Sequence, residues 1–113
     1  MTQRTTQRIR LRRDDGPDLQ FNGTKLGSGS DMMTSVTLYK TTSDKYVVSV
    51  SAGNAFSILE GGKHSVLVAD SLSDAISQIS KTVGLYSPAV KSAFLEASDV
   101  EPTLRALAIE ELK

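Results

Sequence analysis

The sequence predicts an α+β domain, in which an N-terminal antiparallel sheet of about five strands is followed by two to three helices packed on one face. Two observations predict this class. Up to residue 69 apolar residues tend to alternate with polar ones, as in half-buried strands, whereas from residue 71 they recur every three to four residues, as in amphipathic helices. Strands that precede all the helices favour an α+β arrangement over a parallel sheet with interleaved helices.

Two hairpins are predicted within the sheet. The stretch 35–53 contains two runs of β-branched and aromatic residues around a polar turn, which is the strongest strand signal in the chain. The stretch 7–13 alternates apolar Ile9 and Leu11 with arginines, and 19–21 alternates again after a turn rich in aspartate, glycine and proline. A lone hairpin is marginally stable in water, so we expect both to belong to one larger sheet.

Three other segments complete the N-terminal half. The stretch 64–69 is apolar on both faces, which predicts an interior strand. Residues 23–31 include three glycines and two serines, so we expect a flexible loop over residues 23–33. Residues 1–6 are polar, and we expect them to be flexible as well.

Start and stop signals predict the helices of the second half. Ser71 begins a capping pattern, and Gly84 stands where the first helix is expected to end. Ser87 followed by Pro88 is the start signal of a second helix. A third helix is predicted over 102–112, with most of its apolar residues on one face.

The inward-facing apolar residues of these elements predict one hydrophobic core. A chain of 113 residues has the common size of one domain, so we expect residues 1–113 to form a single domain. The predicted core comprises Ile9, Leu11, Phe21, Val36, Leu38, Val48, Val50, Val66, Val68, Ile76, Ile79, Val90 and Phe94.

Composition narrows the possible functions. Thirteen basic and thirteen acidic residues leave no net charge, which disfavours a protein that coats nucleic acid. The lack of cysteine excludes disulfides and thiol catalysis, and one histidine cannot form a histidine-rich metal site, so we expect no metal and no cofactor. No apolar run is long enough to cross a bilayer. We therefore expect a cytoplasmic, non-enzymatic protein with no catalytic site and no membrane contact.

Arginines form the one charged pattern that points to a partner. Arg8, Arg10 and Arg12 alternate along the predicted first strand, so we expect them about 6.6–6.8 Å apart, close to the spacing of successive phosphates. Together with Arg13 they are candidate nucleic-acid-binding residues, because a guanidinium group binds phosphate through two hydrogen bonds. Charged side chains on an edge strand also prevent aggregation, so both interpretations remain open.

The third predicted helix is a candidate partner surface. A helix of eleven residues is unstable alone in water, so it must dock on the sheet or on a second subunit. We expect Leu104 and Leu107 to dock on the sheet, and Ile109 and Leu112 to lie at a dimer interface.

Three functional hypotheses follow. The stretch 38–50 is similar to hairpins of small bacterial α+β proteins and contains no motif that implies an activity. The first hypothesis is a bacterial-type interaction module without enzymatic activity, which binds another protein and forms a homodimer. The second is a nucleic-acid-binding accessory or regulatory protein that uses the arginine-rich strand. The third, a small enzyme or ligand-binding domain, requires a pocket that the sequence does not reveal.

Overall fold

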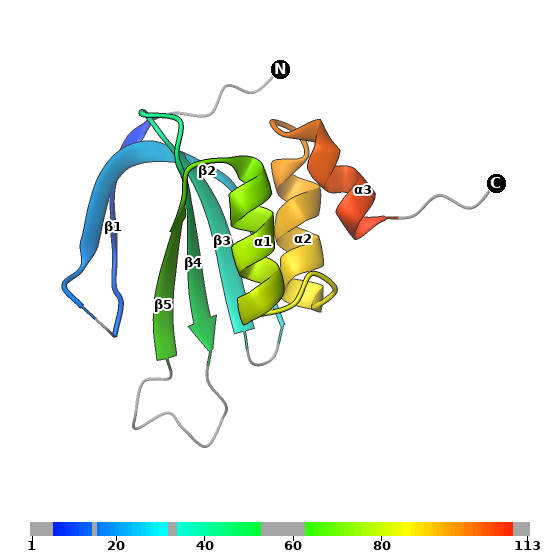
Figure 1. Cartoon of the computed structure of the whole chain (residues 1–113), viewed down its shortest axis with the longest axis horizontal. Helices are drawn as coiled ribbons and strands as arrows, with labels where there is room; N and C mark the ends of the chain where they lie inside the picture. The colour runs from blue at the N-terminus through cyan, green and yellow to red at the C-terminus, as the bar shows by residue number, and fades with distance from the viewer. Residues whose placement is uncertain (1–5, 15, 32–33, 53–62, 110–113) are drawn as a thin grey trace.

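The structure, a computed structural model, describes residues 6–14, 16–31, 34–52 and 63–109. These residues form five strands, namely β1 (Gln7–Leu11), β2 (Leu19–Ser30), β3 (Thr34–Thr41), β4 (Tyr46–Ala52) and β5 (Lys63–Ala69). They also form the helices α1 (Leu72–Thr82), α2 (Pro88–Ala97) and α3 (Arg105–Ala108), with a 3-10 turn (Pro102–Leu104) directly before α3. The helices cover one face of the sheet (Figure 1), which confirms the predicted α+β class.

The sheet is an antiparallel meander, in which each strand pairs with the next in the order β1-β2-β3-β4-β5. The central hairpin of the prediction is β3 and β4, where Val36 lies opposite Val50 and Leu38 lies opposite Val48. Leu67 of β5 lies opposite Val48 on its other side. These five side chains share the face that the helices cover, because side chains opposite one another in a sheet point the same way.

Both predicted helix starts are confirmed. The Ser71 hydroxyl accepts a hydrogen bond from the Asp74 N–H (3.1 Å), which caps α1. The Ser87 hydroxyl accepts one from the Val90 N–H (3.2 Å), which caps α2. The predicted end of the first helix is confirmed as well, since Gly84 has a left-handed φ of 93°. α1 packs on β4 and β5, and α2 packs on β2 and β3.

The prediction of a flexible loop over 23–33 is wrong for residues 23–30, which belong to β2. Their glycines allow the close approach of α2. A Cβ atom added at Gly27 would collide with the carbonyl oxygen of Ala93, and one at Gly29 would collide with that of Ala89. The register with β3 shifts between Lys25 and Gly27, and such a bulge bends a strand. Figure 1 shows β2 curving away from the helices toward its pairing with β1.

The prediction that 64–69 is an interior strand is wrong, because β5 lies at the edge of the sheet. Val66 and Val68 were expected in the core. They lie opposite Ser49 and Val47, on the face without helices, and Val68 is 45% exposed. Leu67 and Ala69 face the helices instead. Both faces of this strand are apolar, so alternation alone could not decide which face is covered.

The main core lies between the sheet and the helices. Seven predicted core residues are buried there: Val36, Leu38, Val48, Val50, Ile79, Val90 and Phe94. Ile76 is half-buried against this core. The prediction was wrong for Ile9, Leu11 and Phe21, which are half-buried on the other face. It missed Leu26, Tyr46, Ala75 and the alanines of α2, whose small side chains let that helix lie close to β2.

The third predicted helix is shorter than expected. After the 3-10 turn, α3 ends at Ala108, and Ile109 has an extended backbone (φ −132°, ψ 125°). Leu104 is fully buried and Leu107 packs against the core, while α3 itself packs on α2. Leu112 lies outside the described residues, as do residues 1–5 of the N-terminal segment expected to be flexible.

A candidate interaction site on the helix-free face

The face of the sheet without helices is apolar at one end and polar at the other. We call it the helix-free face. Pairing places Tyr39, Val47 and Val68 side by side across β3, β4 and β5. One step along the same strands, Thr37, Ser49 and Val66 lie side by side. β1 and the first half of β2 add further apolar side chains to this face, namely Ile9, Leu11, Leu19 and Phe21.

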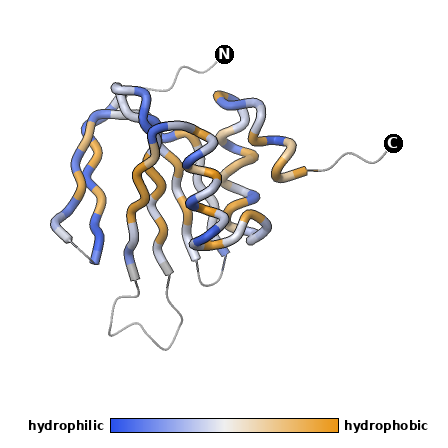
Figure 2. The backbone as a smooth tube through the Cα atoms, viewed as in Figure 1, coloured by the Kyte–Doolittle hydropathy of each residue, from blue (hydrophilic) through white to orange (hydrophobic). Residues whose placement is uncertain are grey.

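On the helix-free face, the hairpin of β1 and β2 partly covers the hairpin of β3 and β4. The ring of Phe21 meets that of Tyr39 edge to face, with centroids 5.6 Å apart. Val47 is only 2% exposed although no helix covers its face. In Figure 2 hydrophobic positions run along the middle of β4 and β5. The sheet therefore has apolar residues on both sides, and the second side is only partly covered.

A cavity of about 260 Å³ lies at the apolar end of this face. Leu19 and Phe21 line it from β2, Val47 from β4 and Val68 from β5. Its polar lining residues are Asn22, Thr41, Thr42, Ser43 and Lys45. Of the residues that line it, only Lys45 carries a charge.

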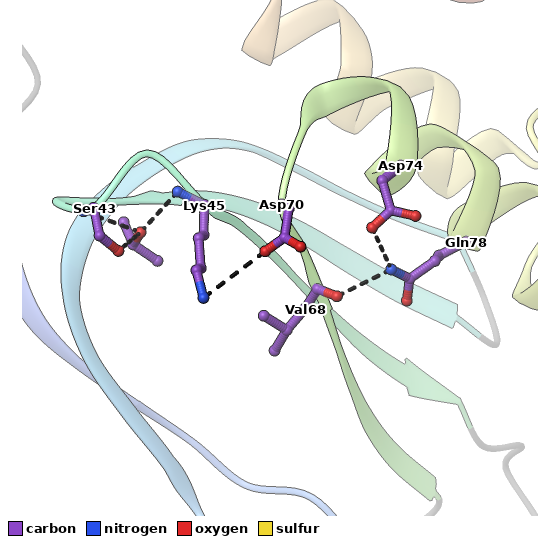
Figure 3. A network of polar contacts seen from close by, with 7 residues as sticks. Ser43, Lys45, Val68, Asp70, Asp74 and Gln78 are labelled. Atoms are coloured by element: carbon purple, nitrogen blue, oxygen red, sulfur yellow. Dashed lines mark hydrogen bonds and ion pairs between the residues drawn. The ribbon is translucent and has the colours of Figure 1, made fainter.

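The turn between β3 and β4 forms the polar rim of the cavity. The Thr41 hydroxyl oxygen accepts hydrogen bonds from the N–H groups of Ser43 (3.3 Å) and Lys45 (3.0 Å). Asp44 has a left-handed φ of 65°, which lets the turn close. The Lys45 ammonium lies 3.8 Å from the Asp70 carboxylate, as Figure 3 shows. Both side chains are largely exposed, so this ion pair is weak and Lys45 can turn to another anion.

The edge of β5 is capped near each end. At His64, the N–H donates to the Asp14 carboxylate (2.8 Å) and the carbonyl accepts from the Asp14 N–H (3.0 Å). This contact ties the turn after β1 to the start of β5. At the other end, the Gln78 amide reaches from α1 and donates to the Val68 carbonyl (3.0 Å; Figure 3). The same amide donates to Asp74 (3.2 Å), which holds it in place.

The candidate nucleic-acid-binding arginines lie on β1 or directly after it. Three of them already have hydrogen-bond or ion-pair partners within the chain. Arg8 donates to the side chain of Asn22 on β2 (3.3 Å). Arg10 forms an ion pair with Asp18 (3.0 Å). Arg13 donates to the Pro17 carbonyl (2.6 Å), and Arg12 is exposed beyond the end of β1. The structure therefore places Arg8 and Arg10 on β1 and Arg12 and Arg13 directly after it, with an acidic residue beside Arg10.

Of the two candidate dimer residues, the described part of the chain contains Ile109. Ile109 is 38% exposed at the end of α3, and Leu112 lies beyond the described residues. Two further apolar side chains are exposed on the helical side, Tyr86 between α1 and α2 (73%) and Val100 after α2 (42%).

One polar cluster joins the sheet to the segment after α2. The Tyr46 hydroxyl donates to the Glu101 carboxylate (2.6 Å), and the Lys40 ammonium lies 3.6 Å from the same oxygen. Burial, the hydrogen bond to Glu101 and the negative charges of Glu101 and Asp44 raise the pKa of Tyr46 to about 12. The Tyr46 side chain itself is buried. The cluster thus anchors the segment after α2 to the sheet.

Sequence reasoning missed the cavity. The signal was present in the two strands 46–50 and 64–69, whose apolar residues occupy both faces. Helices cover one of these faces, and the apolar residues of the other face are then free to line a cavity. The described residues contain no cluster of three or more histidine or acidic side chains that could hold a metal ion. Among the helices that the structure describes, none is long and apolar enough to cross a membrane.

No protein-family model, no curated protein and no solved structure matches the chain.

Proposed function

We propose that this protein is a non-enzymatic protein–protein interaction module that binds its partner on the helix-free face. The observation that carries the proposal is the cavity there, whose floor is apolar and whose rim is polar. An apolar centre surrounded by polar groups is typical of protein interfaces. Val68 supplies a half-exposed apolar side chain at the edge of this floor.

The size of the cavity favours a protein partner over a free small molecule. Its volume of about 260 Å³ lies below the range of about 300–1,000 Å³ typical of pockets for drug-sized ligands. A cavity of this size suits one or two apolar side chains of another protein. The described residues that line it include no histidine and no acidic side chain to activate their hydroxyl groups, which is why we propose binding and not catalysis.

Photo-crosslinking tests this proposal. A photo-reactive amino acid is placed at Val68 in one variant and, as a matched control, at Lys91, which is exposed on α2. In cells that produce the protein, we expect a discrete crosslinked protein from position 68 and none from position 91. Equal background labelling at both positions would contradict the proposal.

We propose in addition that two copies of this chain form a homodimer through a separate contact on the helical side. Ile109, exposed at the end of α3, supports a contact on the helical side. We expect light scattering at micromolar concentrations to give the mass of a dimer, and Ile109→Asp to give that of a monomer. Thr103→Asp, at another exposed position, is the control. A wild-type monomer at high concentration would contradict this part of the proposal.

Nucleic-acid binding is the second candidate function, because Arg8 and Arg10 lie on β1 and Arg12 and Arg13 directly follow it. Exposed Arg8, Arg10 and Arg12 support it, whereas the ion pair of Arg10 with Asp18 weakens it. Binding of the wild type to duplex DNA and RNA, measured over a salt series, should fall steeply with salt if phosphates are contacted. Replacing these three arginines with serine should flatten that slope. No measurable affinity at low salt would rule this function out.

A further inference from the structure

The contacts of Asp14 and Gln78 with β5 show which main-chain groups of this strand point to its outer edge, away from β4. His64 uses both its N–H and its carbonyl to bind Asp14, so both groups point away from β4. Val68 uses its carbonyl to bind Gln78, so this group points the same way. In an antiparallel pair, the main-chain groups of every second residue point to the same side. Val66, midway between His64 and Val68, therefore presents its N–H and carbonyl to the outer edge too.

The middle of this edge is left open. Within the described part of the chain, no hydrogen bond reaches the outer N–H and carbonyl of Val66 or the N–H of Val68. A row of such groups is a template for an added strand. Here the row is short, because Asp14 closes it at His64 and Gln78 closes it at the Val68 carbonyl.

The open edge and the cavity meet at Val68. Its backbone N–H belongs to the open edge, while its side chain lines the cavity on the helix-free face. A strand added beside β5 alternates its side chains as β5 does. One of its side chains would therefore point to the same face as Val68, next to the apolar floor formed by Phe21 and Val47.

We propose that the open edge of β5 binds a short extended segment of another protein, a proposal that rests on the function proposed above. The segment pairs its main chain with Val66 and Val68 and places an apolar side chain in the cavity. An acidic residue two positions away, whose side chain points to the same face, binds Lys45, the one charged residue of the lining. Strand addition of this kind takes affinity from main-chain hydrogen bonds and specificity from alternate side chains.

A second copy of β5 fits this edge less well than a short segment does. If two β5 strands pair antiparallel with Val66 opposite Val66, Val68 of one copy lies opposite His64 of the other. Asp14 already occupies the outer side of His64. A strand of seven residues would collide with the Asp14 turn, whereas a segment of three or four residues stops before it.

Selection from a phage-displayed library of random seven-residue peptides tests the proposal. Against the wild-type protein, we expect enrichment of peptides that carry an apolar residue with an acidic residue nearby. The most enriched peptide is synthesised with a fluorescent label, and its affinity is measured by anisotropy. Its binding should shift the NMR signals of the Val66 and Val68 amides most. The same peptide with N-methyl groups along one edge should bind at least tenfold more weakly.

Val66→Pro is the decisive protein variant. Proline removes the outer N–H and leaves the bonds to β4 intact, a position that edge strands tolerate. We expect it to fold and to lose at least tenfold in affinity, while Val66→Thr, which keeps the N–H, retains binding. If the proline variant does not fold, the N-methylated peptide gives the same test.

Three outcomes would overturn the proposal. They are a library without enrichment, equal binding by wild type and a folded Val66→Pro, and a wild-type dimer that this variant converts to a monomer. A specific crosslink from Val68 combined with any of these would leave the proposed function standing and only the strand-addition mode refuted. Loss of the crosslink as well would refute both.

Discussion

Gly27→Ala tests whether glycine is required in β2 because α2 lies directly on it. A Cβ at this position would collide with the Ala93 carbonyl and lie 2.6 Å from the Ala97 nitrogen. Ordinary contact begins at 3.4 Å, so the helix must retreat by about 0.8 Å from this second atom alone. Both neighbours are main-chain atoms, which cannot rotate away as the end of a side chain can.

The expected loss of stability comes from the gap that this shift of α2 opens between the helix and the sheet. α2 carries Ala93, Phe94 and Ala97, each at most 1% exposed, and a gap of 0.5–1 Å removes roughly a quarter to a half of their dispersion attraction across the interface. We expect the free energy of unfolding to fall by about 2–3 kcal/mol. Backbone preference predicts the opposite sign, because alanine is favoured over glycine in a strand by roughly 0.5–1 kcal/mol.

Urea denaturation followed by circular dichroism measures the change, with Gly16→Ala as the matched control. A Cβ at Gly16 would lie 3.5 Å from the Arg13 side chain, in ordinary contact. We expect this control to change stability by less than about 0.5 kcal/mol. If Gly27→Ala is as stable as wild type, residues 23–30 do not form a strand under α2, and our account of β2 is wrong.

Three further predictions concern single residues. Phe94→Ala removes the largest fully buried side chain and should cost about 3–5 kcal/mol in a denaturant titration; a loss below about 1 kcal/mol would contradict its place in the core. Because the pKa of Tyr46 is raised to about 12 in the folded protein, its contribution to stability is complete below pH 10 and is lost as pH rises toward 12. Glu101→Gln should lower that pKa in an ultraviolet titration, while burial keeps it above its usual value; an unchanged pKa would contradict the contact. Asp44→Val should cost about 1–2 kcal/mol in thermal melts because Asp44 has a left-handed φ, whereas Asp44→Gly should not.

Local patterns in the sequence were sufficient for the order and type of most elements. Period-two alternation identified the hairpin of β3 and β4, and serine caps identified the starts of α1 and α2. These signals work because strand faces and helix ends are decided by residues within a few positions of each other. The same alternation placed the arginines of β1 on the face opposite Ile9 and Leu11.

The glycine-rich stretch of β2 shows where local reasoning fails. Glycine has high backbone freedom, so Gly27 and Gly29 were interpreted as parts of a flexible loop. In the structure they are required by a helix that lies some sixty residues later in the chain. Glycine is required at these positions because of the contact with α2, and no local pattern within β2 reveals this requirement.

The sequence by itself determined that this protein has an antiparallel sheet followed by helices, and that strands β4 and β5 are apolar on both faces. Only the tertiary structure decided which face is covered. α1 and α2 bury the side of Leu67, and this leaves Val68 half-exposed beside a cavity. Likewise, Asp14 and Gln78 reach β5 from other elements, so the open part of its edge depends on contacts distant in sequence. The cavity exists because helices cover one apolar face of the sheet and leave apolar residues on the opposite face only partly covered.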